Sequence, residues 1–146
     1  MAGRGGARGV TVAVRTLMLG VDHFRRSLAE RYDVSVPGLI TLAELRQWGP
    51  RTPKSIGDRL GWSTGGVTSL LDRLEHAGHV KRTPNPADRR SLLIEPTAQG
   101  NRIMEQAFTR LDIAIAEALD TSKVDREQLI TFLETTAANL AEAVDE

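Results

Sequence analysis

The sequence of 146 residues predicts a mainly α-helical protein with one small β-hairpin. Near both ends of the chain, apolar residues recur every three or four positions, which is the spacing of long amphipathic helices. In the middle, shorter apolar stripes begin at capping hydroxyls and end at glycines. Just beyond them, two β-prone segments at 80–83 and 91–94 are joined by a turn-rich connection.

The chain opens with MAGRGGARG, whose four glycines and two arginines predict a mobile basic arm over residues 1–9. A long helix is predicted over residues 10–32. Its apolar stripe consists of Val14, Leu17, Val21, Phe24 and Leu28.

Three shorter helices are predicted next. The first is capped by Ser35 and stops at the Gly-Pro pair 49–50. The second begins at Thr52, which is followed by proline, and ends at Gly61. The third begins at Ser63, and Gly78 supplies the left-handed residue beyond its end. Its buried stripe is Val67, Leu70, Leu71 and Leu74. Because so few residues separate the last two helices, they predict a helix-turn-helix. The hairpin that follows is its predicted wing. The whole winged helix-turn-helix region is expected within residues 35–99.

Two long helices are predicted to close the chain, one capped by Thr97 and one starting near Val124. Their near-heptad stripes are Ile103, Ala107, Leu111, Ala114 and Ala118, then Leu129, Phe132, Leu133, Thr136, Leu140 and Val144. These stripes offer more apolar surface than one small domain can cover. We therefore expect a homodimer of one compact domain, residues 10–146, with 10–32 and 100–146 as dimerisation helices.

Charge is unevenly distributed, although 19 basic and 19 acidic residues cancel overall. Residues 51–99 hold eight bases and five acids, whereas residues 100–146 hold four bases and ten acids. The basic centre, and not the acidic end, is therefore the surface expected to meet a polyanion.

The stretch from Leu60 to Gly100 contains three motifs at a characteristic spacing. They are Val67-Thr68-x-x-Leu71-Asp72-Arg73-Leu74-Glu75, then Gly78-His79-Val80, then Pro86-x-Asp88-Arg89-Arg90. This stretch resembles the multiple-antibiotic-resistance regulator (MarR) family of winged helix-turn-helix repressors, and the predicted helix order extends the resemblance to essentially the whole chain. Two positions depart from the family pattern: Pro96, where leucine is common, and Leu71, where valine or isoleucine is also frequent.

The resemblance implies a transcriptional regulator that binds double-stranded DNA as a homodimer. It implies that Arg90 enters the minor groove, oriented by Asp88 together with Arg73. Asp88 can hold one guanidinium in place while the remaining donors face outward. It also implies a small amphipathic or aromatic effector.

The helix after Ser63 has the features of a major-groove reader. Opposite its leucine stripe it presents the hydroxyls of Ser63, Thr64, Thr68 and Ser69. Gly65 and Gly66 each cost about 1 kcal/mol relative to alanine, which predicts a close approach of backbone to a partner. A frayed first turn is the alternative. Phosphate contacts are expected from Arg51, Lys54, Lys81, Arg82 and Arg89.

Several other functions are disfavoured. Without cysteine, the chain cannot form a disulfide, a thiolate zinc site or a thiol sensor. His23, His76 and His79 lack metal-ligand spacing, so no metal or cofactor is expected, and no catalytic motif points to an enzyme. Trp48 and Trp62 are interpreted as core anchors, with ligand stacking as the alternative. No apolar run could span a membrane and no signal peptide is evident, so a cytoplasmic location is expected.

We therefore expect a ligand-responsive regulator, a repressor by resemblance, acting on a pseudo-palindromic operator. An activator or an architectural DNA-binding protein is the alternative within DNA binding, distinguished by whether one operator is preferred over bulk duplex. A protein-interaction module that has lost DNA binding is the alternative outside it, and the basic centre argues against that.

Overall fold

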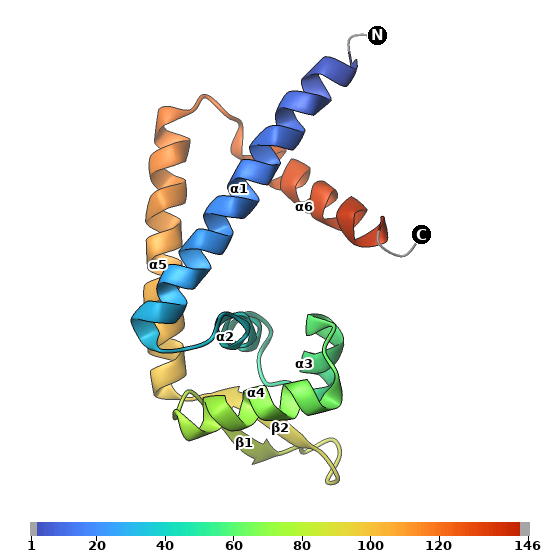
Figure 1. The fold of residues 1–146 in the computed structure, drawn as a ribbon, viewed down its shortest axis with the longest axis vertical. Helices are drawn as coiled ribbons and strands as arrows, with labels where there is room; N and C mark the ends of the chain where they lie inside the picture. The colour runs from blue at the N-terminus through green and yellow to red at the C-terminus, as the bar shows by residue number, and fades with distance from the viewer. Residues whose placement is uncertain (1–2, 144–146) are drawn as a thin grey trace. The chain divides into compact units, whose positions relative to one another are not determined.

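The computed structural model describes residues 3–143, with side chains described for 8–143. Within that range it contains helices and one two-stranded sheet (Figure 1). The helices are α1 (Gly3–Tyr32), α2 (Val36–Trp48), α3 (Pro53–Leu60), α4 (Thr64–His76), α5 (Ala98–Thr121) and α6 (Arg126–Glu142), and the strands are β1 (Val80–Pro84) and β2 (Leu92–Pro96). The predicted class, mainly α-helical with a small β-hairpin wing, is confirmed.

Capping side chains set the helix starts where the sequence predicts them. The hydroxyls of Ser35, Thr52 and Ser63 each accept a hydrogen bond from the backbone N–H three residues on, at 3.2, 3.2 and 3.3 Å. Gly61 and Gly78 adopt φ of +64° and +75° just beyond α3 and α4. The helix-turn-helix is therefore encoded by local hydrogen bonds.

The first helix starts earlier than its composition predicts. Residues 3–9 belong to α1, whereas the sequence predicts a mobile arm over residues 1–9; residues 1 and 2 lie outside the described residues. Each glycine costs about 1 kcal/mol in a helix, and that cost alone predicts an arm. Every residue added to an existing helix, however, also gains a hydrogen bond without a new nucleation step.

The strands pair antiparallel, from Val80 opposite Pro96 to Pro84 opposite Leu92. Each ends beyond its predicted limit, and Pro96 closes the second strand without breaking it. The segment before α3 joins this sheet, because Arg51 and Ile94 exchange backbone hydrogen bonds of 3.2 and 2.8 Å. The wing is thereby attached directly to the start of the helix-turn-helix.

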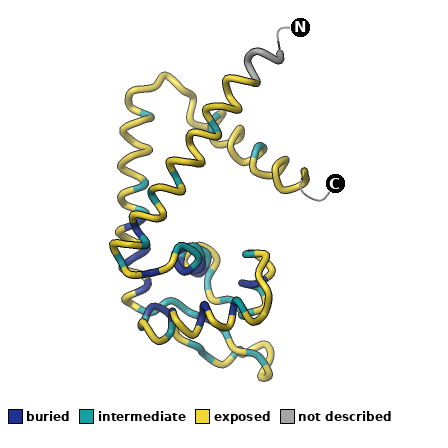
Figure 2. The backbone as a smooth tube through the Cα atoms, in the orientation of Figure 1, coloured by how far each residue is buried: buried dark blue, intermediate teal, exposed yellow. Residues whose placement is uncertain are grey.

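The core of residues 1–107 lies between α2, α4, the sheet and the start of α5, where the buried residues gather in Figure 2. Its largest fully buried side chains are Leu42, Leu45, Leu70, Leu71, Val80, Ile94 and Thr41. Burying a leucine or isoleucine stabilises the fold by about 1.5–3 kcal/mol. The leucine stripe of α4 therefore faces inward, as predicted, and leaves the opposite face exposed.

Contacts divide the chain into two compact units, Met1–Ala107 and Phe108–Glu146, where the sequence predicts one domain. The described residues of α6 include none that is buried, and Ile130, Phe132, Leu133 and Leu140 are exposed. Val144, predicted on the same stripe, lies outside the described residues. Two helices with narrow apolar stripes have too little surface between them to make a core. None of the helices in the described range is long and apolar enough to cross a membrane.

Candidate nucleic-acid interface

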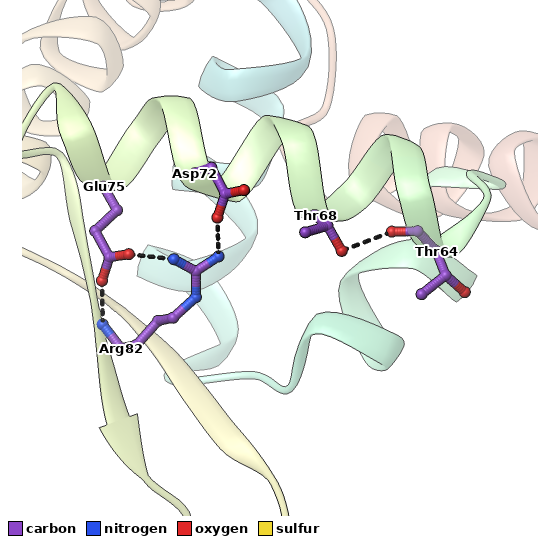
Figure 3. A network of polar contacts seen from close by, with 5 residues as sticks. All are labelled: Thr64, Thr68, Asp72, Glu75 and Arg82. Atoms are coloured by element: carbon purple, nitrogen blue, oxygen red, sulfur yellow. Dashed lines mark hydrogen bonds and ion pairs between the residues drawn. The ribbon is translucent and has the colours of Figure 1, made fainter.

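The outward face of α4 carries the short polar side chains that the sequence predicts there. Thr64, Thr68 and Ser69 are exposed, and Thr64 and Thr68 lie one turn apart on the same side of the helix (Figure 3). The Thr68 hydroxyl donates to the Thr64 carbonyl at 2.9 Å. The Ser63 hydroxyl has a structural role as well, because its oxygen caps α4. The helix thus presents hydroxyls beside a capped N-terminus.

The two glycines in the first turn of α4 are not required by contacts within the described structure. A Cβ at Gly65 would have nothing within 4 Å, and one at Gly66 would lie 3.5 Å from Trp62 and from Ser63. The turn is not frayed, since Ser63 caps it and the Val67 N–H donates to the Ser63 carbonyl at 3.0 Å. The open space at Gly65 is available to an external partner.

The wing tip is held by side chains that fold its backbone. Asn85 Oδ1 accepts from the Ala87 N–H at 3.0 Å, and Asp88 Oδ1 accepts from the Arg90 N–H at 3.0 Å. Both are short-range turns of the kind that Asn and Asp favour. Arg89 and Arg90 are exposed on this turn.

The sequence predicts that Asp88, together with Arg73, orients Arg90 and that it can hold a guanidinium. Within the described residues Asp88 forms no ion pair with Arg73, Arg89 or Arg90. Its contact with Arg90 is the hydrogen bond to the backbone N–H. The sequence predicts Asn85 only as a turn residue. In the structure its side chain also holds the backbone of the wing tip, and its position three residues before Asp88 is the sequence signal for this role.

Arg82 is engaged by partners within the protein. The sequence predicts a phosphate contact, but its guanidinium donates to Asp72 at 2.6 Å and to Glu75, and its side chain is only 24% exposed (Figure 3). The hydrogen bond with Asp72, followed by the contacts with Glu75, raises the pKa of Arg82. Its charge is therefore neutralised within the protein.

The remaining predicted cations separate into a group that is held by contacts within the protein and a group that is exposed and unpaired. Lys81 and Arg51 make up the first group. Lys81 pairs with Glu95 at 3.0 Å, and this contact, with the Thr83 hydroxyl, lowers the pKa of Glu95. Arg51 is half-buried at its bridge to Ile94, and its Nε has no hydrogen-bond partner in the described structure. The second group is exposed and forms no ion pair among the described residues: Lys54, Arg73, Arg89 and Arg90.

Both tryptophans differ from the prediction that they are core anchors. Trp48 is 52% exposed and Trp62 is 39% exposed. The Arg59 guanidinium lies 5.8 Å from the centre of the Trp48 ring and pairs with Glu44. The two rings lie near the ends of helices. Because they do not reach the core, their exposure leaves no gap among the core side chains.

Histidines do not gather into a metal site. His79 is buried and His76 is exposed, and no group of three or more potential ligands occurs among the described residues. Burial lowers the pKa of His79, while the negative charge of Asp33 opposes this. An open hollow of about 620 Å³ lies along α6, lined by that helix alone, so it is not an enclosed ligand pocket.

Comparisons with known proteins agree with this architecture. Residues 34–92 match the model of the MarR family. The chain is 30% identical over 119 residues to the uncharacterized HTH-type transcriptional regulator YcgE of Bacillus subtilis, covering 82% of this chain and 77% of the relative. It is 35% identical over 89 residues to the multiple antibiotic resistance protein MarR of Salmonella typhimurium, covering 61% and 62%.

A solved structure is similar over most of the chain. The crystal structure of apo MarR from E. coli aligns with a TM-score of 0.64 at 25% identity, covering 89% of this chain and 94% of that one.

Proposed function

Because the chain belongs to the MarR family of transcriptional regulators, we propose that it is a ligand-responsive repressor that binds a pseudo-palindromic DNA operator as a homodimer. The proposal places α4 in the major groove and the turn bearing Arg89 and Arg90 against the minor groove. It includes no catalytic activity.

The pairing of an exposed polar face on α4 with an unpaired arginine turn in the wing is the observation that carries this proposal. Thr64, Thr68 and Ser69 can meet base edges or phosphates, and open Gly65 lets backbone come close. Lys54 and Arg73 add cations that are free of ion pairs in the described structure. Such contacts supply affinity that falls with salt.

Exposed apolar side chains on the long helices support the homodimer. Leu17 and Met18 of α1, Ile113 of α5, and Phe132 and Leu133 of α6 are each more than two-fifths exposed. A second copy would remove such surface from water, at roughly 25 cal/mol per Å² buried. A two-fold dimer would present two recognition helices to half-sites about 34–36 Å apart.

An amphipathic or aromatic small molecule is the effector we propose, by similarity to the family. It would favour a spacing of the two α4 helices that no longer matches the groove repeat. A tenfold loss of DNA affinity needs a differential binding free energy of only about 1.4 kcal/mol. The chain contains no cysteine, so its own thiol oxidation cannot be the signal.

The test is a binding titration on the DNA upstream of the chain's own coding sequence, with unrelated duplex as competitor. We expect a specific complex of one dimer per site, with repression of that promoter in a reconstituted transcription reaction. Activation of the promoter would favour the activator instead. Equal affinity for all duplexes would favour an architectural protein, and no duplex binding by a folded protein would favour an interaction module.

A further inference from the structure

Arg82 on β1 contacts two acidic residues of α4 through three hydrogen bonds (Figure 3). Its Nη2 donates to Asp72 Oδ1 at 2.6 Å and its Nη1 donates to Glu75 Oε2. Its backbone N–H donates to Glu75 Oε1 at 3.2 Å. Glu75 therefore binds both the backbone and the side chain of Arg82, which restrains the strand as well as the guanidinium.

The two carboxylates lie where a DNA-reading helix should avoid negative charge. Asp72 is one helical turn beyond Thr68 and two beyond Thr64, on the same side of α4 (Figure 3). Its side chain is 61% exposed even when paired with Arg82. Without the guanidinium, Asp72 and Glu75 would place two uncompensated charges beside the hydroxyls proposed to meet a polyanion.

The same contacts determine where the wing leaves α4. Arg82 lies opposite Ile94 in the hairpin, and β1 continues into the turn that carries Arg89 and Arg90. The neighbouring cation, Lys81, pairs within the hairpin, to Glu95. Among the described residues, the ion pairs that link α4 to the wing are those of Arg82.

We propose that Arg82 is a positioning residue for DNA recognition, which fixes the wing to the reading helix and masks the charges of Asp72 and Glu75 from DNA. Arg82 itself does not touch DNA; it acts through Arg90 and through the two carboxylates. This inference rests on the proposed function.

The experiment measures operator affinity over a series of salt concentrations for the full-length protein and its variants. We expect Arg82→Ala to weaken binding about tenfold. Arg82→Lys should weaken it less, because lysine keeps the positive charge, but some loss should remain, because a single ammonium cannot pair with both carboxylates in a planar fork. In the triple variant Arg82→Ala/Asp72→Asn/Glu75→Gln, part of the affinity should return, because the unmasked charges are gone. Arg102→Ala, at an exposed position of α5 that has no part in the proposed interface, is the charge-matched control, with a change within about twofold.

The positioning role is tested by a double-mutant cycle with Arg90→Ala. In the wild-type background this substitution should weaken binding, whereas in the Arg82→Ala background it should weaken it much less, because the wing is no longer held at the groove. General loss of stability would not produce this coupling. Thermal unfolding of each variant identifies any that fail to fold, in which case Arg82→Lys and Asp72→Asn are used for the cycle.

Three results would overturn the inference: unchanged affinity in Arg82→Ala or, should that variant fail to fold, in Arg82→Lys; no recovery in the triple variant; or an equal fold-loss from Arg90→Ala in both backgrounds. A wild-type protein that binds no duplex would instead refute the proposed function.

Discussion

Gly100 in α5 lies directly against the carbonyl of His79, so closely that a Cβ at position 100 would be 2.2 Å from that oxygen. The same oxygen accepts hydrogen bonds from the Thr97 N–H at 3.0 Å and from the Thr97 hydroxyl at 3.2 Å. The start of α5 is thereby joined to the peptide that links α4 to β1. This junction fixes the end of α4 within the fold.

Gly100→Ala should lower the free energy of unfolding by about 1–3 kcal/mol, because the new methyl group meets backbone that cannot move aside without breaking the Thr97 contacts. Urea unfolding followed by circular dichroism, at one fixed protein concentration, measures the change. Gly20→Ala is the control, since position 20 is also helical and a Cβ there would have nothing within 4 Å. Equal effects of the two substitutions would contradict the role of this contact.

His79 should make the protein less stable in acid. It is 4% exposed, its Nδ1 has no hydrogen-bond partner in the described structure, and burial lowers its pKa despite the opposing charge of Asp33. The unfolded chain therefore takes up a proton near the ordinary pKa of 6.5, before the folded protein does. The free energy of unfolding should fall as the pH drops below about 6.5.

The check is unfolding free energy against pH for the wild type, His79→Leu and the exposed control His76→Leu. Part of the decline between pH 6.5 and lower values should disappear in His79→Leu and persist in His76→Leu. Identical pH profiles for all three proteins would show that His79 is not the group responsible.

Gly65→Ala should separate folding from DNA binding. Alanine has open space at this helical position and should stabilise the protein by about 0.5–1 kcal/mol. Operator affinity should nevertheless fall, since the added methyl would obstruct the approach of DNA to the backbone. Thermal unfolding measures the stability and fluorescence anisotropy measures the operator affinity. A variant that is more stable and binds the operator with unchanged affinity would show that Gly65 is not part of the interface.

Arg90→Ala should weaken operator binding by about 1–3 kcal/mol and leave the dimer intact. The turn that orients Arg90 depends on Asp88 and the backbone, so the substitution should not disturb it. Anisotropy titrations give the affinity and sedimentation gives the oligomeric state. Arg102→Ala, at an exposed position of α5, is the charge-matched control; a loss of equal size there would indicate a general charge effect.

Lys54→Ala should lower affinity for all duplexes alike, because an exposed lysine at the start of α3 can bind phosphate without reading a base. The slope of log affinity against log salt should become shallower by about one unit. Titrations on operator and on unrelated duplex at several salt concentrations provide both values. A change confined to the operator would assign Lys54 to sequence reading instead.

Local patterns were enough to predict the helix-turn-helix, its caps and the hairpin. Ser35, Thr52 and Ser63 cap the helices that follow them because capping hydrogen bonds connect residues three apart, whatever the rest of the chain does. The family motifs lie in this same region, so the class of protein could be predicted together with its fold.

What local patterns could not predict depended on residues that are distant in sequence or on competition between partners. The positive charge of Arg82 suggests a phosphate contact, and only the packing of β1 against α4 brings its guanidinium to Asp72 and Glu75. Trp48 is large and apolar, yet it lies at the end of α2, outside the core. Short-range hydrogen bonds are written into neighbouring residues, whereas burial and ion pairing are decided when folding brings separate segments together.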